Sequence, residues 1–200
     1  MKRVTERRMK GIGALCLALA LAGCSVGKVG PAPVLYDLGA DDGAAVSGGA
    51  ARKPIALAFD AAPALGDTGM IWRVGGSASP KAYARAKWSV SPAELVRQRL
   101  VERLSRLGPV LSEGAAGLPR LQVTLTRFEQ VFAADGTAST GQVSLQAVLL
   151  QADGRVLAQK LVQRSAAAAT QDAEGGARAL RQATDGAADE LSAWLGGALR

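Results

Sequence analysis

The 200-residue sequence contains no histidine. This absence excludes Ser-His-Asp and Cys-His nucleophilic sites, imidazole proton transfer and every His-ligated metal site. Aromatic residues make up only 4% of the chain, although 48% of its residues are hydrophobic. The composition therefore predicts a core built from Ala, Val and Leu rather than from large rings. We expect a single domain that is not an enzyme and that uses no metal or other cofactor.

Acidic residues are scarce only at the N-terminal end of the chain. The formal net charge is +7, from 24 Lys and Arg against 17 Asp and Glu. Five of the basic residues lie in the first ten positions: Lys2, Arg3, Arg7, Arg8 and Lys10. The rest of the chain is close to balanced, and none of its basic residues forms a run interleaved with aromatics. We therefore expect no nucleic-acid partner.

The basic N-terminus opens a pattern typical of an export signal. About twelve apolar residues follow it, at positions 11–22. As a helix they would span about 18 Å, well short of the roughly 30 Å hydrocarbon core of a membrane. The pattern predicts a removable signal peptide rather than a transmembrane helix. We assign residues 1–23 to the signal peptide, residues 24–33 to a Gly/Pro-containing tether and residues 34–200 to the folded domain.

The apolar run ends in Leu21-Ala22-Gly23-Cys24, which resembles the bacterial lipobox. In that motif small residues before the cysteine fit the signal peptidase, and the thiol becomes the attachment point of a diacylglycerol. We predict that Cys24 is lipidated, that its acyl chains include palmitate, and that they anchor the protein in a membrane. The alternative is an ordinary signal peptide with an incidental cysteine.

Cysteine usage favours lipidation. Cys16 leaves with the predicted signal, so Cys24 is the single cysteine of the mature chain and has no intramolecular disulfide partner. Ser25 follows it, where an Asp would act as a retention signal. By resemblance to the sorting of proteobacterial lipoproteins, the absence of that Asp favours the outer membrane, with the domain facing the periplasm.

Alternating apolar segments predict several strands. They lie at residues 34–38, 55–60, 70–74, 121–126, 143–149 and 156–162, with a Gly/Ala-rich loop at residues 39–53. The alternation loses phase at Arg127-Phe128-Glu129, which predicts a bulge or a strand end. Asp153-Gly154 is a two-residue hairpin signal, so we expect the last two strands to pair antiparallel.

Two helices complete the pattern. A capping box at Ser91-Pro92-Ala93-Glu94 and a stop at Gly108-Pro109 predict a helix over residues 92–107. Its apolar stripe is Ala93, Val96, Leu100, Leu104 and Leu107, and its expected solvated face carries Arg97, Arg99, Glu102, Arg103 and Arg106. A second, Ala-rich helix is predicted from about residue 172 to residue 195, ended by Gly196-Gly197. The expected fold class is mixed α/β (α+β), a largely antiparallel mixed sheet flanked by two main helices.

The order of these segments resembles that of a known family. The resemblance is carried by the lipobox, Leu35-Tyr36-Asp37-Leu38, Ile71-Trp72-Arg73, Tyr83 and Trp88 before a capped helix, the segment of residues 121–129, a hairpin and a terminal helix. The chain is similar to the ABC-type transport auxiliary lipoproteins of the PqiC/YmbA type. The resemblance implies an outer-membrane component of a lipid transport system. It implies an ABC transporter and a membrane-tethered MCE-type protein as partners, and it brings no catalytic residues.

The sequence thus indicates binding and docking rather than catalysis. Candidate partner contacts are Tyr83, Trp88, Arg99, Arg103 and Arg106. Two alternatives stay open at this point. One is an accessory lipoprotein for another outer-membrane machine, either pilotin-like or a lipopolysaccharide-insertion helper. The other is an enzyme that uses Ser, Lys or carboxylate chemistry without histidine. The sequence is also compatible with a homo-oligomer.

Overall fold

The structure is a computed structural model that describes residues 31–41 and 52–199. The chain divides into two units, Met1–Ala32 and Pro33–Arg200, and the fold below is that of the second unit. The predicted signal peptide, Cys24, most of the predicted tether and most of the Gly/Ala-rich loop lie outside the described residues.

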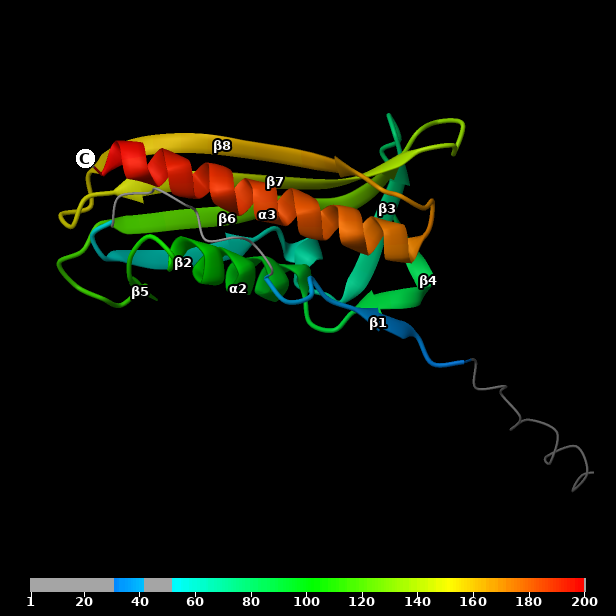
Figure 1. Cartoon of the computed structure of the whole chain (residues 1–200), viewed down its shortest axis with the longest axis horizontal. Helices are drawn as coiled ribbons and strands as arrows, with labels where there is room; N and C mark the ends of the chain where they lie inside the picture. The colour runs from blue at the N-terminus through cyan, green and yellow to red at the C-terminus, as the bar shows by residue number, and fades with distance from the viewer. Residues whose placement is uncertain (1–30, 42–51, 200) are drawn as a thin grey trace, which may run out of the picture. The chain divides into compact units, whose positions relative to one another are not determined.

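One mixed sheet forms the centre of the described domain (Figure 1). Its strands are β1 (Val34–Tyr36), β2 (Ile55–Ala61), β3 (Gly69–Val74), β4 (Lys81–Trp88), β5 (Val110–Ser112), β6 (Arg120–Phe132), β7 (Ser139–Leu150) and β8 (Val156–Ala167). Strands β6, β7 and β8 pair antiparallel in that order. The other edge of β6 pairs in parallel with β2 along its first half and with β3 along its second half. Strand β5 is added to β2, and β4 and then β1 are added to β3.

The structure of strand β6 explains why its alternation of apolar and polar residues is interrupted. Leu121, Val123 and Leu125 point into the core, as the period of two predicts. The pairing with β7 then shifts by one residue between Leu125 and Arg127, which is a β-bulge. Because of this bulge Phe128 faces the core, where an unbroken strand would have turned it to the opposite face. The predicted bulge is confirmed, and the strand continues beyond it.

Helices α2 (Pro92–Leu104) and α3 (Ala173–Ala198) lie side by side on one face of the sheet (Figure 1). The Ser91 hydroxyl accepts a hydrogen bond from the Glu94 backbone N–H at 3.3 Å, as the capping box predicts. The carboxylate of Asp172 caps α3 by accepting from the Gly175 N–H at 2.8 Å. The predicted stop at Gly196-Gly197 is wrong, because α3 continues to Ala198 through both glycines.

The core lies between the sheet and these two helices. Its fully buried members are mostly Leu, with one aromatic pair, Trp88 and Phe128, whose ring centroids lie 5.2 Å apart. Burying a Leu or Val side chain stabilises a fold by about 1.5–3 kcal/mol. Most core residues are the predicted Ala, Val and Leu, and Leu100 and Leu104 of α2 lie among them as expected. The expectation that large rings take no part in the core is wrong for Trp88 and Phe128.

Close approach of α3 to the sheet depends on glycines. A Cβ on Gly141 of β7 would lie 2.5 Å from the Leu180 backbone nitrogen of α3. A Cβ on Gly176 of α3 would lie 2.1 Å from Oε1 of Gln130 on β6. Both distances are below contact distance, so the helix packs against the strands only because these side chains are absent.

The predicted fold class is confirmed as a mixed α+β domain with one mixed sheet and two helices. Strands β4 and β5 were not predicted, because β4 alternates Lys and Arg with Ala and β5 has only three residues. Within residues 31–41 and 52–199, no helix is long and apolar enough to cross a membrane.

Candidate functional site

The structure places the five predicted partner contacts in three different environments. Trp88 lies in the core with 1% of its surface exposed, and packs on Phe128. Arg99, Arg103 and Arg106 lie where α2 meets α3, and Tyr83 lies on β4 at the far end of the sheet. The five residues therefore do not form one surface.

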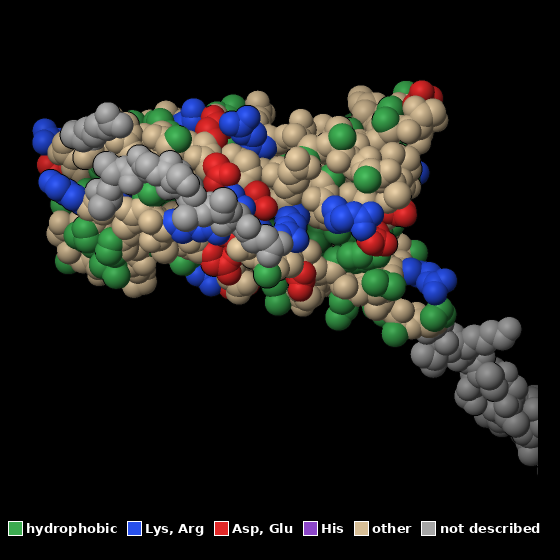
Figure 2. Space-filling model, in the orientation of Figure 1, with side chains coloured by type: hydrophobic (Ala, Val, Ile, Leu, Met, Phe, Trp, Pro, Cys, Tyr) green, Lys and Arg blue, Asp and Glu red, His purple; other side chains and the backbone are tan. Residues whose placement is uncertain are grey.

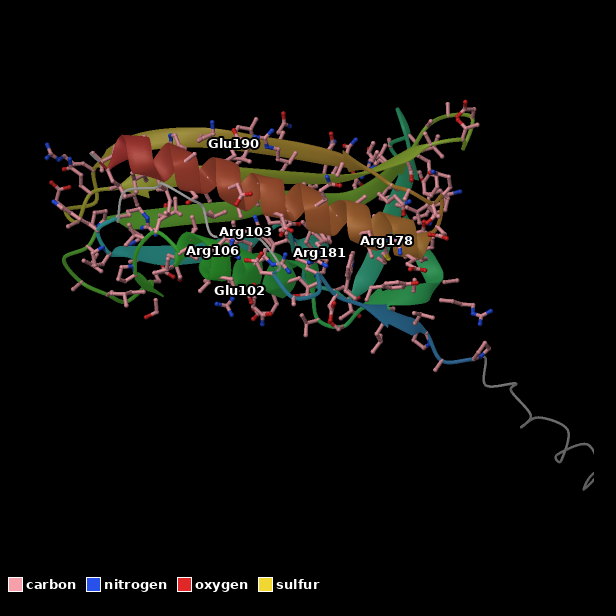
Figure 3. All side chains as sticks on the ribbon, in the orientation of Figure 1. Glu102, Arg103, Arg106, Arg178, Arg181 and Glu190 are labelled. Carbon is pink, nitrogen blue, oxygen red and sulfur yellow. The ribbon has the colours of Figure 1, made fainter. Side chains whose placement is uncertain are left out.

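The arginines of α2 belong to a network that we name the arginine seam. Its members are Arg99, Arg103 and Arg106 of α2, Asp185 and Asp189 of α3, and Asp41. Arg103 contacts carboxylate oxygens of Asp41 and Asp189 at 2.8 Å each. It also lies 3.2 Å from Asp185. Figure 3 shows Arg103 projecting from α2 toward α3.

The other two arginines extend the seam. Arg99 pairs with Asp185 and donates hydrogen bonds to the carbonyls of Leu38 at 3.0 Å and Gly39 at 2.6 Å. Arg106 pairs with Asp41. Side chains of both signs gather between the two helices in Figure 2. The seam thus fastens α2 to α3 and to the segment that follows β1.

The expectation that these arginines form a solvated helix face is wrong for two of them. Arg99 is 2% exposed and Arg103 is 7% exposed. A buried charge is tolerated when it is paired and hydrogen-bonded, and here the carboxylates come from elements distant in sequence. Burial alone would lower the pKa of Arg103, but its hydrogen bond to Asp189 and the charges of Asp185, Asp189 and Asp41 raise that pKa overall.

Sequence reasoning missed the acidic half of the seam. Asp185 and Asp189 are four residues apart, so they share one face of α3. This spacing was a usable signal, because it puts two carboxylates on one side of an Ala-rich helix. Asp41 carried no such signal, since it lies in an irregular segment.

A second feature is an apolar groove of about 600 Å³ at the opposite end of the α3 axis from its C-terminus, which we name the aromatic groove. Its lining residues are Trp72, Val74, Ala82, Tyr83, Ala84, Phe132, Ala133, Ala134, Gly136 and Gln171. The Trp72 ring centroid lies 5.5 Å from that of Phe132 and 6.1 Å from that of Tyr83. Lys81 Nζ lies 5.2 Å from the Trp72 ring centroid, a cation–π distance.

Tyr83 joins the aromatic groove to the interior. Its hydroxyl donates a hydrogen bond to Oε1 of the fully buried Gln130 at 2.8 Å. The Gln130 amide in turn donates to the Ser139 hydroxyl at 2.8 Å. Burial first, and then the charges of Asp172 and Tyr36, raise the pKa of Tyr83 to about 12. The phenol is therefore a neutral donor that fixes one wall of the groove.

Glu129 is the one buried acid on β6, within the described residues. It pairs with Arg73 of β3 at 2.6 Å and lies 3.5 Å from Arg127.

No group of three or more His, Cys, Asp and Glu side chains that could hold a metal occurs in the described part of the chain. What the two features offer chemically is an intramolecular clamp in the seam and an apolar binding surface in the groove.

Comparisons with known proteins identify the family from a family model and the fold from solved structures. The model of the family described as "ABC-type transport auxiliary lipoprotein component" matches residues 36–192. No curated protein matches the chain. The crystal structure of protein XCC0632 from Xanthomonas campestris is similar with a TM-score of 0.72 and 18% identity, over 82% of this chain and 95% of that one.

A second crystal structure, described as that of an uncharacterized protein, has a TM-score of 0.63 and 14% identity. The likeness covers 82% of this chain and 98% of that one. At such identities the two structures show a shared fold. The family match spans every strand from the end of β1 to β8, all of α2 and most of α3. The chain belongs to the family of ABC-type transport auxiliary lipoprotein components.

Proposed function

We propose that this protein is an outer-membrane-anchored, periplasm-facing lipoprotein that docks an MCE-type membrane protein of an ABC lipid transport system. It acts by binding and positioning rather than by catalysis. One observation carries the proposal: the match to the auxiliary-component family begins twelve residues after Cys24, the cysteine of the predicted lipobox. The lipid on Cys24 holds the domain at the membrane, and residues 24–33 serve as the tether.

The arginine seam defines which part of α2 a partner reaches. Arg99 and Arg103 are engaged inside the domain, and Trp88 is in the core. The Arg106 side chain keeps 22% of its surface exposed beside Asp41. We therefore retain Arg106, at the solvent side of the seam, as the candidate contact with the partner. Tyr83 lines the aromatic groove and lies outside the seam.

Partner capture from cells tests the proposal. The full-length tagged lipoprotein is purified from membranes in gentle detergent, and the co-purifying proteins are identified. We expect an MCE-type protein and its ABC transporter subunits to be recovered, with recovery reduced for Arg106→Glu. Arg155→Glu, at the exposed turn between β7 and β8, is the matched control and leaves recovery unchanged.

Repeated recovery of no MCE-type protein, together with unchanged lipid phenotypes when the gene is deleted and failure of another outer-membrane assembly, contradicts the transport role. The assembly alternative would then replace it.

A further inference from the structure

Strand β8 is the longest open edge of the sheet among the described residues. Its twelve residues pair with β7 on one side and with no described strand on the other (Figure 1). Strands β1 and β5, at other margins of the sheet, have three residues each. An open edge is a template for pairing with another chain, and natural sheets keep such edges short or protect them with charged side chains, proline or bulges. Strand β8 therefore offers far more pairing length than β1 or β5.

The register shows which residues of β8 have backbone groups directed to the open edge. The Ala168 N–H donates to the Ser139 carbonyl at 2.9 Å, and the register with β7 is unbroken from Ala158 to Ala167. Hydrogen-bonded and non-hydrogen-bonded pairs alternate along antiparallel strands. The even-numbered residues of β8 therefore bond to β7, and the odd-numbered residues direct their N–H and C=O groups away from it. These odd-numbered residues are Gln159, Leu161, Gln163, Ser165 and Ala167.

The usual protection of an edge is missing along this stretch. It contains no proline, and the register shift in its pairing with β7 lies before it. Its two cations, Lys160 and Arg164, are drawn toward α3, because each binds the Glu190 carboxylate at 2.9 Å. Leu161 is adjacent to the buried Val162 and so points to the opposite face, where it is 56% exposed. The stretch thus combines free backbone groups with an exposed apolar side chain.

An extended segment of a different protein suits this edge better than a second copy of β8. In a two-fold antiparallel pair centred on Val162, Lys160 of each copy would stand opposite Arg164 of the other. Like charges directly opposite one another destabilise a sheet, and within each copy these two cations share the Glu190 carboxylate. The complementary segment is therefore extended, has no cation opposite Lys160 or Arg164, and has an apolar side chain opposite Leu161.

We propose that the open edge of β8, residues 158–167, binds an extended segment of the MCE-type protein as an added strand, an inference that rests on the proposed function. The odd-numbered residues supply main-chain hydrogen bonds, and Leu161 packs against an apolar side chain of the added strand. This contact is separate from Arg106 of α2. Arg155 also lies outside it, because its guanidinium bonds to Asp153 within the β7–β8 turn at 2.9 Å.

Proline at Gln163 tests the main-chain contact. Because the Gln163 N–H is directed to the open edge, Gln163→Pro removes no hydrogen bond to β7, and proline is tolerated on edge strands. The full-length tagged lipoprotein is purified from membranes in gentle detergent. We expect Gln163→Pro to keep the circular dichroism spectrum of the unaltered protein. We expect it to recover about tenfold less MCE-type protein, because a carbonyl of the added strand loses its donor.

Ala152→Pro is the matched control. Ala152 is the second residue of a turn that the Gly154 N–H closes by donating to the Gln151 carbonyl at 2.9 Å. Proline is favoured at this position of a turn. Because Ala152 lies outside residues 158–167, we expect this variant to recover as much MCE-type protein as the unaltered chain.

Photo-crosslinking in cells makes the test independent of how the proline variant folds. A photo-reactive phenylalanine analogue replaces Gln163 or, as the control, Gln122 of β6, and both of these side chains are exposed. Neighbouring strands lie about 4.8 Å apart, so an added strand lies one such spacing from β8 and three from β6. We expect a crosslink to the MCE-type protein from position 163 and none from position 122.

The outcomes separate this inference from the proposed function. If the unaltered chain recovers an MCE-type protein while position 163 gives no crosslink to it, or while a folded Gln163→Pro variant recovers as much, the edge contact is overturned and the proposed function stands. Recovery of no MCE-type protein by the unaltered chain overturns both. A crosslink from position 163 to a second copy of this chain overturns the proposal and assigns the edge to self-assembly.

Discussion

At the scale of single residues, Arg103 joins three segments of the chain. Its guanidinium meets Asp41 from the segment after β1 and Asp185 and Asp189 from α3. Removing one partner from a buried ion pair costs more than the pair contributes, because the remaining charges stay buried without compensation. The side chains of Arg103 and Asp41 are each 8% exposed, whereas Asp189 is half exposed, so part of the cost is relieved by water.

We expect Arg103→Met to lower the free energy of unfolding by about 2–4 kcal/mol. Arg97→Met is the matched control on the same helix, since Arg97 forms an exposed pair with Glu94 and should cost less than about 1 kcal/mol. Urea denaturation followed by circular dichroism measures both. Equal losses in the two variants would contradict the structural role of the seam.

Tyr83 gives a second residue-scale prediction, in its ionisation. Its pKa is raised to about 12 by burial and then by the charges of Asp172 and Tyr36. In an unfolded chain the pKa of tyrosine is about 10. The folded state therefore holds the proton longer, and the stability that this supplies is complete below about pH 10 and is lost as the pH rises toward 12.

Ultraviolet titration of tyrosinate measures this directly. The chain has two tyrosines, so in the Tyr36→Phe variant only Tyr83 contributes. We expect the titration midpoint of Tyr83 to lie well above that value in the folded protein, and at about pH 10 in denaturant. A midpoint in the folded protein equal to the denatured one would show that the phenol is not shielded as the structure describes.

At the scale of elements, two glycines of α3 differ in the room that the packing leaves for a side chain. Gly176 leaves no room for a Cβ, which would meet the Gln130 side chain at 2.1 Å. Gly186 has Arg164 atoms as its nearest neighbours, at 3.9 Å or more. Overpacking a tight contact destabilises by about 1–3 kcal/mol. Replacing an unconstrained helical glycine by alanine stabilises by about 1 kcal/mol.

Gly176→Ala is therefore expected to lower the unfolding temperature and Gly186→Ala to raise it. Differential scanning calorimetry of both variants checks the signs. Stabilisation by both alanines would mean that α3 does not approach β6 as closely as the structure places it.

The elements also show what the sequence could predict. The capping box, the alternation in β6 with its bulge, and the antiparallel pairing of β7 with β8 depend on neighbouring residues, so the sequence predicted them correctly. The predicted two-residue turn at Asp153-Gly154 is wrong in length, because residues 151–155 connect β7 to β8. The burial of Arg99 and Arg103 depends on carboxylates up to 86 residues away, so a helical wheel of α2 alone assigned both side chains to solvent. The aromatic groove could not be predicted from the sequence either, because Trp72, Tyr83 and Phe132 come from three different strands.

At the scale of the whole molecule, the domain has two distinct ends. The end with β1, β3 and β4 receives the chain from the predicted tether and carries the aromatic groove (Figure 1). The β7–β8 turn and the C-terminus of α3 lie at the other end. In sequence, the predicted tether of residues 24–33 would join a lipid on Cys24 to the first of these ends.

This arrangement requires Cys24 to carry the lipid, which gives the last prediction. We expect Cys24→Ser to accumulate as a larger precursor that takes up no labelled palmitate, because both signal cleavage and acylation of lipoproteins require the thiol. Cys16→Ser is the matched control, since Cys16 lies inside the predicted signal and should be processed and labelled normally. Labelling in cells, electrophoresis and membrane fractionation measure precursor size, palmitate and attachment together. A Cys24→Ser protein that is processed and membrane-attached like the unaltered protein would contradict lipidation.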